Sequence, residues 1–444
     1  MNRNSNNNVH QSGVRKLRGI ICLPVLLLAL MAPAAQAQTR LIVRDSLGLG
    51  GLNLSCLLLG CSVKYGLGDP QGQVFLVTFP AILNPLTSLL NLRLQTGVLD
   101  VEFDQAVKTR GATAGPAPSY LTDKTPVSYY GTTVWHGYLA QPGNQLIRTD
   151  SVHNSYSATG KGVTIAVIDT GVDTTHPVLQ GVLVSGYDFT RNSSGGNEKN
   201  DVTASPNMSY AEAGVVNQST VALLDQSTVA LLDGNGAYAA FGHGTMTAGL
   251  VHLVAPQAKI MPLKSFGPDG SGYASDVLRA VYYGVKNGAR VLSMSFSFST
   301  YSPELANAVK YAISNGAVCV ASAGNDGQQV QVYPAALPNV IDVASTSDYD
   351  VQSSFTNYGA PPITLAAPGE GIMTLYPWGT YAAGWGTSFS TPLVAGAAAV
   401  MLGQNGLCSA TSVNEALQDG VFISNPQLNN IRLDAYASTQ ACGH

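Results

Sequence analysis

The sequence has few charged residues, only three tryptophans and only six cysteines. Of its 444 residues, 11% are charged and 45% are hydrophobic, and the chain contains 47 glycines and 23 prolines. This composition excludes intrinsic disorder for most of the chain and indicates a compact, loop-rich globular protein. At the usual ~150 residues per domain, the length corresponds to about three units.

Basic residues are scarcer than acidic ones. The chain has 22 Lys and Arg against 26 Asp and Glu, and four of the basic residues lie before residue 38, where there is no acid. Without that segment, 18 basic residues remain against 26 acidic ones, a net charge of −8. This acidic balance argues against a nucleic-acid-binding surface, so we expect no nucleic-acid partner.

No uninterrupted apolar stretch reaches the length of a membrane-spanning helix. The run at residues 20–31 has about 12 residues, whereas a span needs ~20. It follows a basic, Asn-rich head and precedes Ala35-Gln36-Ala37, which has the small-x-small pattern that signal peptidase cleaves. We therefore predict a signal peptide over residues 1–37, a secreted protein and no stable membrane anchor. An uncleaved anchor is the alternative.

Secretion would allow disulfides to form. Cys22 would leave with the signal peptide, so five cysteines remain. Cys56 and Cys61 are five positions apart, Cys408 and Cys442 bracket the C-terminal segment, and Cys319 lies alone in an apolar run. We predict two bridges and one buried thiol. The alternative is that all five are packed thiols.

Residues 38–107 have the pattern of a separate small unit. Apolar and alternating runs predict four strands, and two leucine-rich stretches predict helices between them, in the order β-α-β-β-α-β. This order is typical of a ferredoxin-like α+β fold, in which both helices cover one face of the sheet. Residues 108–145 are rich in Gly, Pro and Ala and then in aromatic and turn residues, which predicts an exposed linker and an N-terminal arm.

From about residue 160, strand, loop and helix patterns follow one another repeatedly. The strands, such as VTIAVID and RVLSMSF, are continuous apolar runs, as expected for a parallel sheet that is covered on both faces. We therefore predict an α/β domain with a mostly parallel sheet over residues 146–444. In such sheets, ligands bind beyond the carboxyl ends of the strands.

An insertion at about 190–236 interrupts this domain. It contains the octapeptide QSTVALLD twice in succession, at 218–225 and at 226–233. Two short copies are too few for a solenoid. We interpret the repeat as a duplication tolerated in a surface insertion, with a role in substrate access as the alternative.

Three polar residues lie where the predicted architecture favours a site. Asp169 ends the strand VTIAVID, His243 lies in GHGTMTAG at a helix start, and Ser388 lies in GTSFSTPLVAG, where another helix begins. Acid, base and nucleophile thus occur in the order Asp, His, Ser. Taken singly, each residue is more simply explained as a turn former, a surface residue or a helix cap.

The helix that follows Ser388 suits a nucleophile. A helix N-terminus offers free N–H groups and a partial positive charge where an oxyanion would form. A serine hydroxyl also needs a base within hydrogen-bond reach before it is a good nucleophile. Pro392 has no N–H, so we expect the Ser388 carbonyl to lack its usual helical hydrogen bond.

Together with their contexts, these motifs resemble the subtilisin-like serine proteases, the subtilase family. The resemblance covers roughly residues 130–438, and the segments that carry it occur in family order: VIDTGVDTTHP, FGHGTMTAG, MPLK, MSFS, ASAGNDG, YPAALPNVIDVAST, LAAPG, GTSFSTPLVAGAAA and RLDAYAS. It implies a three-layer α/β domain and a serine endopeptidase. The resemblance implies that Ser388 would attack the substrate and that His243 would take the proton of the Ser388 hydroxyl. Asp169 would orient the imidazole of His243, and Asn325 would donate a hydrogen bond to the oxyanion.

The resemblance also places two stretches along an extended substrate backbone. They comprise Gly270, Ser271, Gly272 and Tyr273 in the first stretch and Ser295, Phe296 and Ser297 in the second. Two departures from the family pattern matter. Met246-Thr247 stands where His-Val is frequent, and Ser297 stands where glycine is frequent, which leaves the preference at the cleaved residue open.

The resemblance further implies a precursor that processes itself. Residues 38–107 resemble the inhibitory, folding-assisting prodomain of the family, whose C-terminal tail lies in the active site. We expect polypeptide substrates, a monomer and no required cofactor. Structural calcium is frequent in the family, but the sequence shows no ligand set that we would name, and no P-loop, HExxH, GxSxG or EF-hand motif occurs. The alternatives are a catalytically inactive relative that acts as a binding protein and a sedolisin-type acid peptidase, against which GHGT argues.

Overall fold

The structure is a computed structural model that describes residues 38–108, 115–203, 221–223, 238–359, 363–404 and 406–442. The predicted signal peptide, the second copy of the octapeptide and part of the predicted linker therefore lie outside the described residues. Within the described ranges, no helix is both long enough and apolar enough to cross a membrane.

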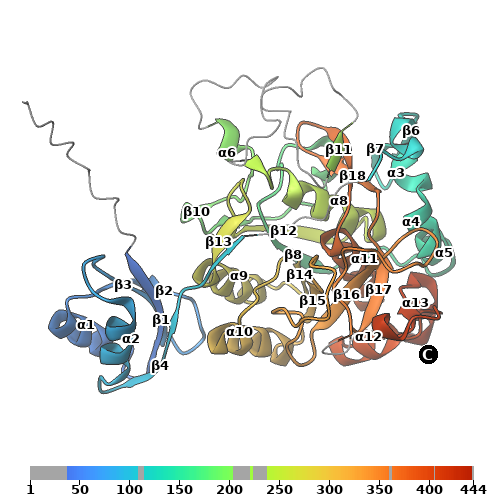
Figure 1. Cartoon of the computed structure of the whole chain (residues 1–444). Helices are drawn as coiled ribbons and strands as arrows, with labels where there is room; N and C mark the ends of the chain where they lie inside the picture. Colours follow the sequence, from blue (N-terminus) through green and yellow to red (C-terminus); the bar gives the residue numbers. More distant parts are fainter. Residues whose placement is uncertain are drawn as a thin grey trace, which may run out of the picture. The chain divides into compact units, whose positions relative to one another are not determined.

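Residues 38–104, which we call the small unit, form the predicted four-stranded sheet (Figure 1). The strand order is β2-β3-β1-β4, and every pairing is antiparallel. Leu52 of one helix and Leu89 of the other pack in one cluster with Val43 of the sheet, so both helices cover the same face. The predicted β-α-β-β-α-β order is thus confirmed. The elements are β1 (Thr39–Asp45), α1 (Gly48–Leu59), β2 (Ser62–Gly66), β3 (Val74–Phe79), α2 (Pro85–Arg93) and β4 (Val98–Phe103).

The described residues from 115 onward, which we call the large domain, are built on a ten-stranded sheet. Its order is β10-β9-β12-β8-β14-β15-β16-β17-β21-β20, and all pairings from β9 to β21 are parallel. The mostly parallel sheet is therefore confirmed. The strands are β8 (Thr164–Asp169), β9 (Tyr187–Asp188), β10 (Ser193–Ser194), β12 (Lys259–Lys264), β14 (Val291–Met294), β15 (Val318–Ser322), β16 (Ile341–Thr346), β17 (Leu365–Pro368), β20 (Val421–Phe422) and β21 (Ile431–Arg432).

Helices cover both faces of this sheet, which explains why its strands are apolar throughout. In β8, Ile165 and Val167 join the cluster of α8 and α11, whereas Ala166 and Ile168 join the cluster of α9 and α10. The three-layer α/β fold is thus confirmed. The helices are α8 (His243–Val254), α9 (Ala274–Lys286), α10 (Pro303–Ser314), α11 (Thr387–Leu402), α12 (Ala410–Ala416) and α13 (Ala435–Cys442).

Helices α8 and α11 are buried along their whole length. Their sequences are rich in small residues, which allow them to approach each other closely. A Cβ atom at Gly396 of α11 would lie only 2.6 Å from the Cβ atom of Val254 in α8. The small-residue runs of the sequence thus bring together the two helices that carry His243 and Ser388.

The predicted N-terminal arm packs onto α8. The Tyr129 hydroxyl donates to the carbonyl of Leu253, and the Tyr138 hydroxyl donates to that of Gly249, both at 2.6 Å. The arm contains β6 (Pro126–Tyr129), β7 (Thr132–Trp135) and α3 (His136–Ala140), and it is followed by α4 (Pro142–Leu146) and α5 (Thr149–Tyr156).

A second, three-stranded sheet has the order β11-β19-β18. Its strands are β11 (Val221–Leu223), β18 (Ile372–Tyr376) and β19 (Thr380–Gly384). Strand β11 lies in the first copy of the octapeptide and pairs with β19. Strand β19 leads directly into the turn before α11.

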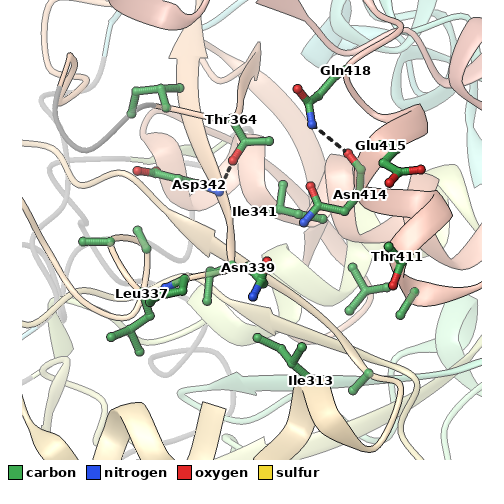
Figure 2. Close-up of a pocket in the computed structure, with 18 of the residues that line it drawn as sticks. Ile313, Leu337, Asn339, Ile341, Asp342, Thr364, Thr411, Asn414, Glu415 and Gln418 are labelled. Atoms are coloured by element: carbon green, nitrogen blue, oxygen red, sulfur yellow. Dashed lines mark hydrogen bonds between the residues drawn. The ribbon is translucent and has the colours of Figure 1, made fainter. Parts of the chain in front are cut away.

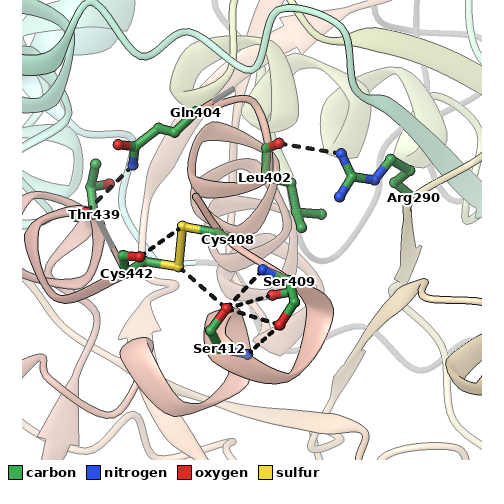
Figure 3. The surroundings of a disulfide bond; sticks show 8 residues. All are labelled: Arg290, Leu402, Gln404, Cys408, Ser409, Ser412, Thr439 and Cys442. Carbon is green, nitrogen blue, oxygen red and sulfur yellow. Dashed lines mark hydrogen bonds between the residues drawn. A yellow bond between two sulfur atoms is a disulfide. The ribbon is translucent and has the colours of Figure 1, made fainter. Parts of the chain in front are cut away.

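The cysteines pair as the sequence predicts. Disulfides join Cys56 to Cys61 and Cys408 to Cys442, and Cys319 is a buried free thiol in β15. Burial raises the pKa of the Cys319 thiol to about 12. Figure 3 shows how the second bridge ties α13 to the segment before α12.

Candidate active site

The three predicted residues lie at the same end of the central sheet. Asp169 is the last residue of β8, His243 is the first residue of α8, and Ser388 lies in the first turn of α11. Because the strands around β8 are parallel, these positions follow the carboxyl ends of the strands, where open α/β sheets bind ligands. Asp169 is 3% exposed, and His243 and Ser388 are each 8% exposed.

Asp169 holds the imidazole of His243. The Nδ1 atom of His243 lies 2.7 Å from Oδ1 of Asp169, and the backbone N–H of Thr170 donates to the same oxygen at 2.7 Å. The hydroxyl of Thr247 donates to the other carboxylate oxygen at 3.2 Å. A proton on Nδ1 shared with Asp169 leaves Nε2 as the basic nitrogen of the ring.

Ser388 contacts the end of β14. Its hydroxyl donates to the carbonyl of Ser295 at 3.3 Å, and no hydrogen bond joins it to His243 in this structure. In return, the Ser295 hydroxyl donates to the Ser388 carbonyl at 3.0 Å. Pro392 cannot donate to that carbonyl, so Ser295 takes the place of the missing helical donor.

Both helices begin after a glycine that no other residue could replace easily. Gly242 has φ +86°, and a Cβ atom there would lie 2.3 Å from the ring of Tyr376. Gly386 has φ +145°, which side chains rarely permit. The glycines of GHGT and GTSFS therefore set the direction in which each helix starts.

Asn325 lies beside the start of α11. Its Oδ1 atom accepts hydrogen bonds from the backbone N–H and the hydroxyl of Thr387, both at 2.9 Å. These bonds fix which end of the amide is the acceptor. The carboxamide is thus held next to the backbone of the residue that precedes Ser388.

The first predicted substrate stretch pairs with a segment of the chain itself. Strand β13 (Ser271–Tyr273) forms an antiparallel pair with β5 (Ala106–Lys108), in which Gly272 lies opposite Val107. The guanidinium of Arg40 lies 3.9 Å from the centre of the Tyr273 ring. Gly270 precedes this strand in a left-handed conformation, with φ +78°.

The second predicted stretch is split between the site and the core. Ser295 contacts Ser388, as described above, and Ser297 is half-buried. The side chain of Phe296 is 3% exposed and packs against Phe266, with ring centres 5.1 Å apart. Of this stretch, Ser295 contacts the site, whereas the side chain of Phe296 belongs to the core.

Polar contacts join the small unit to the large domain. Glu102 accepts from the hydroxyl of Ser302 at 2.6 Å, at the start of α10, and Asp104 accepts from the backbone N–H of Ser275 at 2.8 Å, near the start of α9. Arg44 donates twice to Glu304, at 2.8 and 2.6 Å. Burial raises the pKa of the Glu102 carboxyl to about 7.

Sequence reasoning missed several polar residues near Asp169. Thr247 could have been predicted from the sequence, because it lies four positions after His243 and therefore on the same face of the helix. Glu198 and Lys264 are completely buried beside the same strand end. Lys264 ends the motif MPLK, for which the sequence suggested no role, whereas Glu198 comes from a part of the chain that no sequence motif marks.

A cavity of about 780 Å³ lies at the opposite end of the sheet (Figure 2). Val318 and Ile341, which line it, begin β15 and β16, whereas the candidate residues follow the carboxyl ends of strands. Asp342 also lines it, and burial raises the pKa of that carboxyl to about 8. The cavity is therefore separate from the site around Ser388.

The described residues contain no group of three or more His, Cys, Asp and Glu side chains that could hold a metal ion. The acidic residues nearest the site are occupied by protein partners instead. Asp201, for example, accepts from Lys264 at 2.8 Å and also pairs with Arg191.

Residues 160–429 of the chain match the subtilase family. Thermitase of Thermoactinomyces vulgaris is 34% identical over 272 residues, which are 59% of this chain and 82% of thermitase. The thermophilic serine proteinase of Bacillus sp. (strain AK1) is 35% identical over 273 residues, 61% of this chain and 59% of that protein. Subtilisin BL of Lederbergia lenta is 31% identical over 277 residues, 62% of this chain and 89% of that protein. The matched range includes every candidate residue named above except those of the small unit and β5.

Proposed function

The chain belongs to the subtilase family and is a serine endopeptidase hydrolase, and we propose that Asp169, His243 and Ser388 are its catalytic triad. The observation that carries this assignment is the 2.7 Å contact between His243 Nδ1 and Asp169 Oδ1, made beside the helix start that presents Ser388. Members of the family need no cofactor for this chemistry, and the substrate is a polypeptide.

In the proposed mechanism, the Ser388 hydroxyl attacks the scissile carbonyl carbon while Nε2 of His243 takes its proton. The C–N bond then breaks as His243 returns the proton to the leaving amine, and Ser388 keeps the acyl group. Water, deprotonated by the same nitrogen, releases the acid. For this step the Ser388 hydroxyl must turn from the Ser295 carbonyl to Nε2 of His243. Such a change is expected, because catalytic hydrogen bonds often form only when substrate is bound.

Two groups at the start of α11 are suited to bind the oxyanion. The backbone N–H of Ser388 is among the first N–H groups of the helix, which have no partner within it. The Asn325 carboxamide is held beside it by Thr387. Loss of one such side-chain donor in subtilisin costs about 2.7–4 kcal/mol of transition-state stabilisation, and we expect a similar cost here.

We also propose that residues 38–107 inhibit the enzyme until the chain cleaves itself. The support is that β5, at the end of this segment, occupies the edge of β13, where an extended substrate would add a strand. The segment 108–114 that follows is rich in small residues and would be cut by Ser388. With the predicted signal peptide, this makes the protein a secreted zymogen.

A fluorophosphonate probe tests the assignment of the nucleophile. We expect covalent labelling of Ser388 in the mature enzyme, and the Ser388→Ala chain should remain unlabelled and keep the mass of the precursor. Maturation of purified Ser388→Ala chain at the normal rate would exclude self-cleavage. Absence of labelling in a folded, processed wild-type chain would favour the inactive binding protein instead.

A further inference from the structure

Glu198 is a completely buried side chain whose carboxyl group bonds to the residue after Asp169 and to the residue before His243. It precedes α6 (Asn200–Thr203), in the part of the predicted insertion that the structure describes. Four donors converge on it. Oε2 accepts from the backbone N–H of Gly242 at 2.9 Å and from the hydroxyl of Thr170 at 3.1 Å. Oε1 accepts from the backbone N–H of Thr245 at 3.1 Å and from its hydroxyl.

These contacts replace the missing cap of α8. The first N–H groups of a helix have no helical acceptor, and a side chain at the N-cap position usually supplies one. The N-cap of α8 is Gly242, which has no side chain and has no room for one against Tyr376. Glu198 supplies the acceptor from another segment.

The same carboxylate reaches the turn that follows Asp169. The Thr170 hydroxyl donates a hydrogen bond to Glu198 and accepts one from the backbone N–H of Gly244 at 2.9 Å. Glu198 therefore holds two separate segments at once. One is the strand end that carries Asp169, and the other is the helix turn that carries His243.

Buried charges surround this carboxylate. Lys264, which is completely buried, donates to the Thr170 carbonyl at 2.7 Å and to Asp201. Burial raises the pKa of Glu198 to about 8; the nearby Asp169 raises it further, whereas Lys264 and the Thr245 hydrogen bond lower it. The phenol of Tyr376 also lies in the field of Glu198.

We propose that Glu198 is a positioning residue for the triad: by joining Thr170 to the first turn of α8, it keeps Nδ1 of His243 and the carboxylate of Asp169 in hydrogen-bonding register. The proposal rests on the proposed function. Glu198 bonds to neither predicted substrate stretch, so its effect should fall on the chemical step and not on substrate binding.

The test compares Glu198→Ala and Glu198→Gln with the wild-type enzyme on a short peptide substrate. Precursors that do not mature are processed in trans with a trace of wild-type enzyme. We expect Glu198→Ala to lower kcat about ten- to a hundredfold, because it leaves buried donors without their acceptor, with KM changed less than twofold. Glu198→Gln keeps the side-chain volume and one accepting oxygen, so its kcat should lie between those of Glu198→Ala and the wild-type enzyme.

A proton NMR measurement on Ser388→Ala chains provides a readout that does not depend on activity. The Nδ1 proton shared by His243 and Asp169 should give a strongly downfield resonance, which Glu198→Ala should shift or broaden. If Ser388 proved not to be the nucleophile, this resonance would still test the positioning role, so the two failures can be told apart.

Asp342→Asn is the matched control, because it changes another buried carboxylate at the opposite end of the sheet. We expect it to leave kcat and the resonance unchanged. If Glu198→Ala does not fold, Glu198→Gln and Thr245→Val replace it, since each removes part of the same contact set. Wild-type kcat in a folded Glu198→Ala enzyme, or an unshifted resonance, would overturn the proposal.

Discussion

The small unit and the large domain bury their apolar residues very differently. Every residue of α8 and α11 is buried in the large domain. In the small unit, α1 buries only Leu52, Ser55 and Cys56, and its Leu57 is 79% exposed. A helix that is apolar on all sides is normally found in a core. The large domain encloses such helices, whereas the small unit is too thin to do so.

The small unit therefore depends on its partner surface. One face of its sheet packs under α1 and α2, but Ile42 and Leu76 on the other face belong to the same cluster as Val281 of α9. A two-layer unit of this size is marginally stable on its own. The comparison indicates that the small unit is held in place as much by the large domain as by its own core.

The largest expected effect concerns the packing of the two regions. Leu250→Ala in α8 should lower the free energy of unfolding by about 2–5 kcal/mol, because Leu250 is completely buried. Leu57→Ala in α1 is the matched control and should change it by less than about 0.5 kcal/mol. Urea denaturation of both variants in the Ser388→Ala chain, which avoids self-digestion, measures the difference. Equal effects would contradict the comparison.

The second prediction addresses the contact between the regions. Arg44 donates two hydrogen bonds to Glu304, whose side chain is almost completely buried. Arg44→Ala leaves that carboxylate without its partner, so the affinity of a separate 38–108 peptide for the large domain should fall by about tenfold or more. Arg93→Ala removes an exposed ion pair with Asp100 and should change the affinity less than twofold. Titration calorimetry distinguishes the two variants, and equal losses would mean that Arg44 makes no special contribution.

The sequence predicted the elements of both regions, and the resemblance implied that the tail of residues 38–107 lies in the active site, but it named no individual contact between the regions. Strand β8 and the helix starts at His243 and Ser388 are encoded locally, by an apolar run or by a glycine-led motif. The pairing of β5 with β13 and the position of Glu198 depend on the path of long loops, which periodicity does not reveal.

The third prediction concerns pH. The pKa of Glu102 is raised to about 7 by burial, from an ordinary value of 4.5. The docked state of the small unit therefore favours the protonated form of the Glu102 carboxyl. Docking is strongest below pH 4.5, weakens as the pH rises from 4.5 to 7, and is constant above pH 7. Binding of the 38–108 peptide to the Ser388→Ala domain should weaken by roughly 40-fold between pH 5 and pH 7.

Glu102→Gln is the control for this titration, because it keeps the shape but cannot ionise. Burial also raises the pKa of Asp276, near the same interface, to about 7. The difference between wild-type and Glu102→Gln chains therefore isolates the contribution of Glu102. If both show the same pH dependence, the weakening comes from Asp276 or another group.

The smallest effect is expected where the chain repeats itself. Deletion of 226–233 leaves one copy of QSTVALLD, and the resulting sequence is the same whichever copy is removed. The residues that form β11 and pair with β19 are therefore still present. Loop-closure entropy changes slowly with length, by about 0.6 kcal/mol per doubling, so folding should tolerate the shorter insertion.

Unlike the buried helices α8 and α11, this insertion should accept the deletion with less than a twofold change in kcat on a short peptide. The sharper measurement is a peptide library, which compares cleavage preferences before and after the deletion. A changed preference with unchanged folding would make the repeat part of the substrate path, close to β19 and the turn before Ser388. A loss of kcat of more than tenfold in a folded chain would contradict the interpretation of the repeat as a tolerated duplication.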